Sequence, residues 1–465
     1  MKTLIAMFIA AFGLMISASA EKRMWTDSRG LEVEAEMLGT DSSASGPTVR
    51  LKLADGRIVA FPFRNLSAED QKYVQSRQPA DPSRAAAQID QLVFVKLKTA
   101  NGELKTRLAA ISDDTSLTQE ERAKKVEELE FLIEMTFPTT KTTDEQFLRR
   151  IYLDIAGRIP TYEEAVLFLE SNSRDKRAAL VDQLLDSEAA TSHLFNQLSD
   201  LLRIRSQLTM NMQNLEARSY MDWVKDQLRS NRPWNDVVTE MLTAQGTLWD
   251  NPAVGYLYTD FNMPLCSLSN TFTVFLGTEI TCAQCHDHPF EEVYQMDFYK
   301  MAAFFGRMEY RAPNSAKAAV IRAEEQRIQS EMARINPDPN MQRDQRLSQI
   351  MRSYQYTLGD GKTNRTQLPH DYKYDDGEPK QLVEPATYFG AIIDTEEFAT
   401  PRAAFATWLT SKENPRFTIN LVNRLWKSAF GLAQIEPVHN IPGHLDGQAQ
   451  NYELLTYLEQ LMKDL

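Results

Sequence analysis

Apolar and polar residues alternate along the first part of the chain, between residues 23 and 74. Spacing of two residues is typical of half-buried β-strands. Asp55-Gly56 favours a tight hairpin, and Ser67 can cap a helix that carries Asp70 in its first turn. The pattern predicts a small β-barrel or curled sheet. Its alternating apolar positions are Val33, Ala35, Met37, Val49, Leu51 and Leu53.

Helical spacing dominates the rest of the chain, where apolar residues recur every three or four positions. Amphipathic helices are expected from Thr143 onward, and Gly157 with Pro160 breaks the chain before Thr161 opens the next helix. Residues 313–355 are rich in charge and read as two helical halves separated by prolines. The sequence therefore predicts a mainly α-helical protein with a small N-terminal β module.

Composition narrows the possible partners. The chain has 465 residues, of which 43% are hydrophobic and 25% charged, as in ordinary globular proteins. Its net charge of −13 repels phosphate backbones, so nucleic acid is not an expected partner. No Gly-rich phosphate loop, nucleophile-elbow serine or HExxH motif occurs, and the question of enzymatic activity stays open.

The first 20 residues have the pattern of a signal peptide. Lys2 precedes an apolar run over residues 4–16, and Ala18-Ser19-Ala20 is a cleavage pattern. An uncleaved anchor is the alternative, although the run is short for a membrane span. We expect a periplasmic or otherwise extracytoplasmic protein with no membrane span after cleavage.

One motif carries a strong chemical signal: Cys282-Ala283-Gln284-Cys285-His286-Asp287-His288. It contains two of only three cysteines in the chain, too few for a disulfide framework. In an oxidising compartment a CxxC pair persists as a covalent haem site, a metal site or a disulfide. All three uses are open at the level of the sequence.

In the haem alternative, Cys282 and Cys285 bind the vinyl groups of haem c, and His286 Nε2 binds the iron for electron transfer. Pro289 suits the first turn of a new helix, so one long helix cannot run through the motif. His288 lies too close in sequence to supply the sixth iron ligand. The nearby methionines that could do so are Met263, Met296 and Met301.

In the metal alternative, Cys282, Cys285, His286 and His288 surround a zinc or iron ion. Four protein ligands make a closed structural site, whereas three leave a position for water and hydrolysis. Asp287 and Glu291 can then orient the histidines or act as a base.

The third alternative is a disulfide between Cys282 and Cys285, either as a redox pair or as a structural link. Cys266 is expected to pack as a small apolar residue, with a metal ligand or disulfide partner as its alternative roles.

The remaining histidines are weaker candidates. His193 lies in a helical pattern and is expected to pack there, whereas His370, His439 and His444 lie in loop-like sequence and are candidate distal ligands. His370 is favoured because the following aromatic and acidic residues can line a pocket. They are Tyr372, Tyr374, Asp375 and Asp376.

Two resemblances to known families add to this picture. The segments WTDSRGLEVEAEMLG and LADGRIVAFPFRNLSAEDQKYV resemble the Sla homology domain, an SH3-like module. Its relatives are associated with peptide recognition, ubiquitin binding and self-association. The resemblance implies that residues 21–78 can bind a peptide, a protein partner or a second copy, or can act as a structural adaptor.

The segment TDEQFLRRIYLDIAGRIPTYEEAVLFL, and the sequence onward through ITCAQCHDHPF, resembles the planctomycete cytochrome-associated domains of unknown function. Residues from Arg402 onward resemble the start of the companion domain of that family. The resulting organisation is a signal peptide (1–20), the β module (21–78), a linker with supporting helices (79–142), the domain with CxxCH (143–312), a charged helical insertion (313–355) and a shortened companion domain (356–465).

These observations favour an exported c-type haem protein, or a haem-associated electron-transfer protein, that exchanges electrons with a redox partner protein. The alternatives are a structural or hydrolytic protein with a zinc or iron site, and a scaffold that acts through its β module.

Overall fold

The computed structural model describes residues 23–28, 30–43, 46–53, 57–76, 82–137, 141–205, 207–210, 213–311, 315–335, 356–387, 393–443, 445 and 447–464. The signal peptide, the Asp55-Gly56 hairpin and His444 lie outside these residues. The chain divides into two compact units. The first comprises residues 1–190, 425–434 and 446–465, and the second comprises residues 191–424 and 435–445.

The first unit begins with a four-stranded antiparallel sheet in the order β1-β2-β3-β4. Trp25 and Val49 are buried in its core, and the Arg23 guanidinium both pairs with Asp70 at 2.8 Å and lies 3.8 Å from the centre of the Tyr73 ring. The elements are β1 (Arg23–Thr26), β2 (Glu32–Ser43), β3 (Gly46–Leu53), β4 (Ile58–Pro62), η1 (Phe63–Asn65) and α2 (Ala68–Ser76).

The predicted small sheet is confirmed, but a closed barrel is not. Within the described residues β1 pairs with β2 alone and β4 pairs with β3 alone. The strand β1 has only four residues, and beyond it Asp27 forms an isolated bridge to Leu66 rather than a ladder to β4. The sheet curls at this point without closing on itself.

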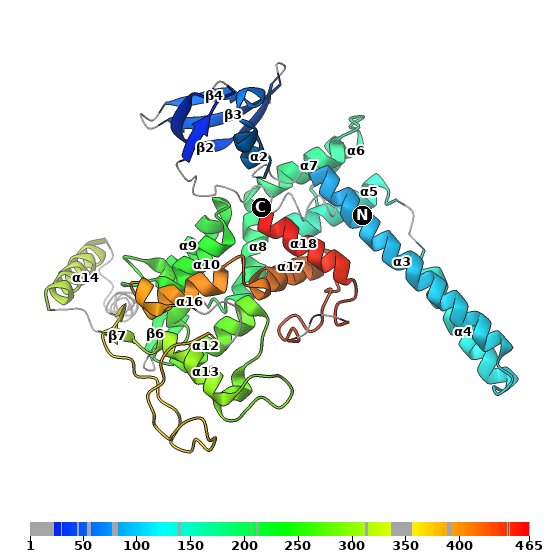
Figure 1. Ribbon diagram of the computed structural model, residues 1–465. Coiled ribbons are helices and arrows are strands. Elements are labelled where there is room, and N and C mark those ends of the chain that lie inside the picture. The colour runs from blue at the N-terminus through cyan, green and yellow to red at the C-terminus, as the bar shows by residue number, and fades with distance from the viewer. Residues whose placement is uncertain are drawn as a thin grey trace. The chain divides into compact units, whose positions relative to one another are not determined.

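Two long helices form a hairpin, α3 (Pro82–Asp113) and α4 (Gln119–Met135), and they lie side by side in Figure 1. Thr118 starts α4 with a capping box, in which its side chain accepts from the Glu121 amide and the Glu121 carboxylate accepts from the Thr118 amide. The base of α3 packs against α18 (Tyr452–Asp464), where Asn451 donates to the Leu92 carbonyl at 3.2 Å.

Shorter helices complete the first unit around a core that includes Phe147, Ile151 and Tyr152. The helix α5 ends in a π-helical turn, η2, and Gly157 follows in the left-handed conformation at φ 66°. These elements are α5 (Asp144–Ile151), η2 (Tyr152–Ala156), α6 (Tyr162–Leu169), α7 (Lys176–Leu185) and α8 (Glu188–Leu201), the last of which runs on into the second unit.

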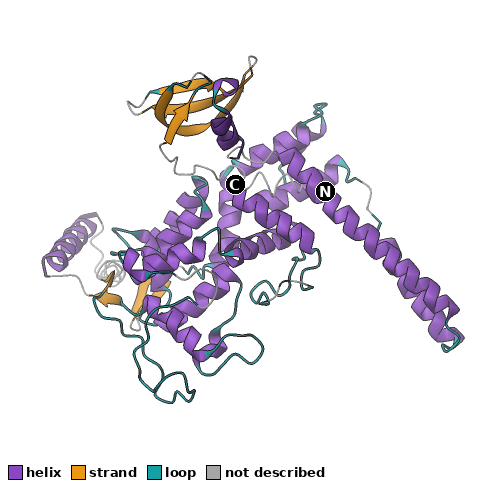
Figure 2. Cartoon of the chain, in the orientation of Figure 1, coloured by secondary structure: helices purple, strands orange, loops and turns teal. Residues whose placement is uncertain are grey.

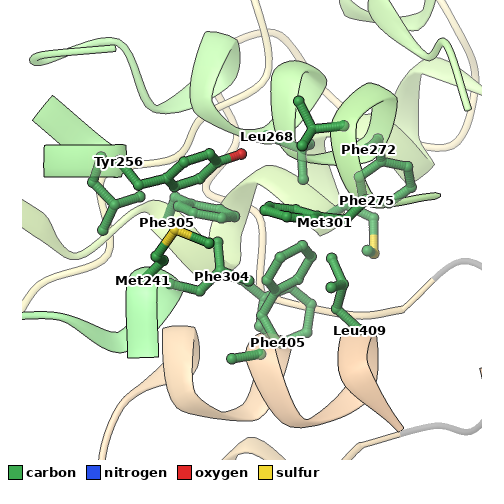
Figure 3. Close-up of a cluster of buried hydrophobic side chains, with 14 of the residues drawn as sticks. Met241, Tyr256, Leu268, Phe272, Phe275, Met301, Phe304, Phe305, Phe405 and Leu409 are labelled. Atoms are coloured by element: carbon green, nitrogen blue, oxygen red, sulfur yellow. The ribbon is translucent and has the colours of Figure 1, made fainter. Parts of the chain in front are cut away.

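The second unit is built around an aromatic core. Phe272, Phe304 and Phe305 pack against Phe405 of α16 (Pro401–Thr410), with the rings of Phe305 and Phe405 5.0 Å apart (Figure 3). Its helices and turns before the insertion are α9 (Arg218–Arg229), α10 (Trp234–Thr243), η3 (Pro252–Val254), α11 (Gly255–Tyr258), α12 (Pro264–Thr271), η4 (Phe272–Leu276), η5 (Thr281–Gln284), α13 (Gln295–Ala302) and η6 (Ala303–Phe305).

The remaining elements of this unit include two short strand pairs. They are β5 (Gln207–Met210) with β6 (Gln213–Glu216), β7 (Met308–Arg311) with β8 (Thr357–Asp360), η7 (Thr395–Glu397), α16 (Pro401–Thr410) and α17 (Pro415–Phe430). Arg402 of α16 is fully buried, pairs with Asp360 at 2.6 Å and donates to the carbonyls of Leu242 and Ala244.

The predicted mainly helical class is confirmed, and Figure 2 shows strands only in the N-terminal sheet and the two short pairs. The first half of the charged insertion forms α14 (Ser315–Ile335), while residues 336–355 lie outside the described part. No helix within the described residues is long and apolar enough to cross a membrane.

Candidate functional site

The CxxCH motif forms a tight helical turn in the second unit. The Cys282 carbonyl accepts hydrogen bonds from the amides of Cys285 at 3.1 Å and His286 at 3.3 Å. Ala283 is fully buried and anchors the turn, whereas Cys282, Cys285 and His286 are exposed. No disulfide joins the two cysteines, and the motif presents both sulfurs and an imidazole to solvent.

Hydrogen bonds from α13 fix the inner face of the turn. The Gln284 carbonyl accepts from Gln295 Nε2 at 3.0 Å and from the Tyr299 hydroxyl at 3.3 Å. Both donors belong to α13, which also places its first amide, that of Gln295, 2.9 Å from the Asp287 carboxylate. The helix α13 therefore holds the turn through Gln284 and Asp287, while both cysteines stay exposed.

The orientation of His286 suits metal ligation through one ring nitrogen. Its Nδ1 lies 2.7 Å from the Asp287 carbonyl oxygen. A carbonyl only accepts, so we assign the proton to Nδ1, which leaves the Nε2 lone pair uncommitted. A histidine that binds a metal commonly donates its other N–H to such an acceptor.

His288 is engaged differently. Its Nδ1 accepts from the amides of Phe290 at 3.3 Å and Glu291 at 3.0 Å, and its own amide donates to the Val293 carbonyl at 2.9 Å. The Nδ1 lone pair is therefore used inside the loop, and a neutral ring carries its proton on Nε2. In this arrangement His288 organises the loop and offers no free lone pair to a metal.

The aromatic and acidic run after His370 packs against the motif. The Asp287 amide donates to the Tyr374 hydroxyl at 2.8 Å, and the Tyr372 hydroxyl donates to Asp376. Burial raises the pKa of Tyr372, and the hydrogen bond and charge of Asp376 raise it further. Sequence analysis expected this run to line a pocket beside His370. None of its four residues lines the pocket that contains His370, and Tyr374 instead supports the backbone of Asp287.

A pocket of about 620 Å³ lies on the Gln284 side of the turn. Met263, Cys266 and His370, three of the candidate ligands, line it together with Gln284 and Tyr299. Burial raises the pKa of Tyr299, with further contributions from the Cys285 thiol and Asp371. Neither motif cysteine nor His286 lines this pocket.

The other candidate ligands are dispersed. Met296 and Met301 are buried core residues, His193 Nε2 lies 3.1 Å from Gln197, and His439 is exposed. In the part of the chain that the structure describes, no group of three or more His, Cys, Asp or Glu residues is arranged to hold a metal ion. The geometry does not bring the four proposed metal ligands to one point.

The C-terminal segment supports the approach to the motif, which sequence analysis did not anticipate. From α17, Asn420 Nδ2 donates to the Val274 carbonyl at 2.8 Å, and Arg416 Nη1 donates to Thr278 Oγ1 at 3.3 Å. The Ile441 amide donates to the Gly277 carbonyl at 2.6 Å.

The same segment reaches the loop after the motif, where the Gly443 amide donates to Glu291 at 3.2 Å. A signal for this role was present in the sequence. The helix α17 carries polar residues on its buried side, and buried polar groups require specific partners. They are Thr418, Asn420 and Asn423, and buried Asn414 directly precedes the helix.

Three family models match the chain. The SLA1 homology domain 1 model, SHD1, matches residues 17–81; the PSCyt2 model, a protein of unknown function, matches residues 133–310; and the PSD1 model, also a protein of unknown function, matches residues 401–464. The chain carries these three regions in the order that its sequence predicts. No curated protein and no solved structure matches it.

Proposed function

We propose that this chain, in which an SHD1 region precedes PSCyt2 and PSD1 regions, is an exported electron-transfer protein that binds haem c at Cys282, Cys285 and His286. The observation that carries the proposal is the exposed turn with two free thiols and a histidine whose Nε2 lone pair is uncommitted. A bound haem would supply one-electron transfer at this position.

The donor set fits haem better than it fits a closed metal site. Two thiols and one imidazole fall one ligand short of the four that structural zinc requires, and His288 already uses its Nδ1 lone pair in the loop. Covalent haem attachment needs only the residues that the turn presents.

The chemistry of attachment is balanced without an oxidant. Each thiol adds across one vinyl group, so that a carbon–sulfur bond forms and the thiol proton passes to the neighbouring carbon. Both cysteines must therefore be reduced and accessible, as Cys282 and Cys285 are. The Asp287 carbonyl keeps the proton of His286 on Nδ1, so the residue can bind iron through Nε2 without first losing a proton.

The proposal includes an extracytoplasmic location and a redox partner protein. Two exposed aromatic side chains lie in the loop after the motif, Phe290 at 90% exposure and Tyr294 at 57%. Exposed aromatics next to an electron-transfer site suit a transient contact with another protein. Electrons would enter and leave at this face.

The test is to express the chain with a haem-attachment system and to record its pyridine haemochrome spectrum. The proposal expects a c-type spectrum for the natural chain and for Cys266→Ser, which lies outside the motif. Cys282→Ser and Cys285→Ser should each lose one thioether bond and shift the haemochrome maximum. A natural chain without haem that holds stoichiometric zinc or iron would overturn the proposal in favour of the metal alternative.

The β module supports a second, separate function. It exposes Leu31 at 63%, Met24 at 50% and Val33 at 41%, on or next to the edge strand β1. The backbone N–H and carbonyl of Thr26 already bind Asp70 and Ser67, so an extended peptide would pair with the part of this edge before Thr26. The test compares peptide capture by the natural whole chain and by its Met24→Lys, Leu31→Lys variant. A peptide that the natural chain captures and the variant does not would support this role. Equal capture by the two would exclude this edge.

A further inference from the structure

The α3–α4 hairpin is stabilised by an unusually thin core. Along α3, half-buried residues follow a heptad spacing at Leu97, Asn101, Leu104, Leu108 and Ile111, and α4 shows the same spacing at Arg122, Val126, Leu129, Ile133 and Thr136. This is the seam of an antiparallel coiled coil. Asn101 marks its register, since its Nδ2 donates to Thr136 Oγ1 at 2.6 Å and to the Ile133 carbonyl.

Within residues 93–137 only Leu129 is buried. Helices in proteins owe most of their stability to tertiary packing of an apolar face. One buried side chain over residues 93–137 leaves this part of the hairpin without a full core. A further surface is needed to cover it.

Six large apolar residues lie exposed outside the seam, and we call them the hairpin patch. On α4, Phe131 and Met135 are 62% and 66% exposed and lie one turn apart. Exposed apolar side chains that lie next to each other, as this pair does, mark interaction sites in soluble proteins. The patch comprises Phe94, Val95, Phe131, Leu132, Met135 and Phe137.

Charge identifies what covers the patch. Over residues 94–107, α3 carries four basic residues, Lys96, Lys98, Lys105 and Arg107, and one acidic residue, Glu103. Over residues 126–135, α4 carries four glutamates, Glu127, Glu128, Glu130 and Glu134, and no basic residue.

The contacts of Asn101 place these two stretches at the same level of the hairpin. Yet none of the salt bridges that the described residues form joins α3 to α4. Basic and acidic groups are thus presented side by side, each without a salt-bridge partner on the neighbouring helix.

We infer that the hairpin patch is covered by the hairpin of a second copy of this chain. A two-fold contact requires a self-complementary surface. A hairpin with a basic stretch on α3 and an acidic stretch on α4 meets that requirement, because the two-fold axis sets the basic stretch of each copy against the acidic stretch of the other. The apolar patch residues of both copies then form the common core of a four-helix bundle.

Sedimentation velocity on the mature full-length chain tests the inference. The natural chain should form a dimer that weakens as salt rises, because the paired charges are screened. Phe131→Ser with Met135→Ser removes exposed apolar surface only, and it should raise the dimer dissociation constant at least about tenfold while the far-ultraviolet circular dichroism stays unchanged.

Charge reversal separates this contact from any other. The double variant Lys96→Glu, Lys98→Glu should be a monomer, and so should the double variant Glu127→Lys, Glu128→Lys. An equimolar mixture of the two should form a heterodimer. Arg149→Glu with Arg150→Glu on α5 makes the same charge change elsewhere and should leave the dimer intact. A monomeric natural chain, or a mixture that stays monomeric, would overturn the inference.

Discussion

Two helices of this protein end in the same way and yet have opposite surroundings. In the first unit α5 passes into the π-helical turn η2 and stops at Gly157, and in the second unit α12 passes into η4 and stops at Gly277. Each glycine is left-handed, with φ of 66° and 57°, and each donates its amide to the carbonyl five residues back. The two helix ends therefore share the same backbone conformation and the same capping hydrogen bond.

The two ends differ in what lies beyond them. Gly157 is exposed and leads to a surface ion pair between Arg158 and Glu164. Gly277 leads to the CxxCH turn and is enclosed by the C-terminal segment. A Cβ on Gly277 would lie 2.7 Å from Asn420 Oδ1 and 2.9 Å from Ile441 Cδ1. The same helix ending is a simple stop at one place and a docking point for a distant part of the chain at the other.

Alanine at the two glycines should show the largest contrast. Gly157→Ala should cost about 1–2 kcal/mol of unfolding free energy, the strain of a left-handed alanine. Gly277→Ala adds crowding against Asn420 and Ile441 and should cost at least about 3 kcal/mol.

Urea unfolding followed by tryptophan fluorescence measures both costs. Asparagine is the control, because it tolerates the left-handed conformation. It should restore most of the stability at position 157 and none at position 277. Equal costs at the two positions would mean that the contact with the C-terminal segment contributes nothing.

Asn420→Ala should have the next largest effect. It leaves the Val274 carbonyl without its donor and removes an acceptor of Arg424 Nε, at a cost of about 1–3 kcal/mol. Labelling of Cys282 and Cys285 by a maleimide should also change in rate, since the turn loses a tether upstream. Asn235→Ala, an exposed site on α10, is the matched control and should change neither quantity.

Glu164 should make the stability of the first unit depend on acid. The hydrogen bond from Arg158 lowers the pKa of this carboxyl to about 2, against burial that raises it. Because the folded pKa lies below the unfolded value, its stabilisation is present above the unfolded pKa of 4.5 and is lost as pH falls toward 2.

Glu164→Gln keeps an acceptor for the Thr161 amide but loses the charge. The loss at neutral pH should be at most about 1 kcal/mol, as for other exposed pairs. Unfolding midpoints between pH 2 and 5 should then become less dependent on pH. A variant that keeps the full acid dependence would show that another carboxyl is responsible.

Asp297 occupies the third position of α13, as Glu164 does in α6. Its effect on the pH dependence of stability should be opposite in sign to that of Glu164 and the smallest of the four. Burial raises its pKa, although the Tyr294 amide donates to it and lowers the pKa in part. A raised folded pKa gives stability that is present at low pH and is lost as pH rises through that pKa.

Asp297→Asn keeps the acceptor for the Tyr294 amide and removes the buried charge. It should therefore slightly raise the thermal unfolding midpoint at neutral pH, with no gain at a pH below the ordinary aspartate pKa of 3.8. Asp297→Ala, which removes the acceptor as well, should lower the midpoint at both pH values.

The sequence predicted the local features of the fold well and the long-range ones poorly. Thr143 and Thr161 start helices as expected, because capping depends on residues within one turn. A helical pattern alone could not show that α5 and α12 end in π-helical turns, since a π turn adds one residue per turn without changing the apolar composition.

In the candidate site, too, the local part could be predicted from the sequence and the long-range contacts could not. The CxxCH residues were found from their spacing, and their exposure on one turn agrees with that spacing. Arg416 and Asn420 could not be linked to Thr278 and Val274 by any periodicity, because they lie more than a hundred residues along the chain. Contacts at that separation follow from the packed fold, not from local propensity.

The distance along the chain between the turn and its support has a consequence for biosynthesis. Asn420 is made 146 residues after Val274, the residue it holds. At roughly 5–20 residues per second, the interval between the two is on the order of ten seconds. For that time the newly made cysteines have left the ribosome while the segment that steadies them does not yet exist. The CxxCH turn can therefore gain its full set of supporting contacts only after Asn420 has been made.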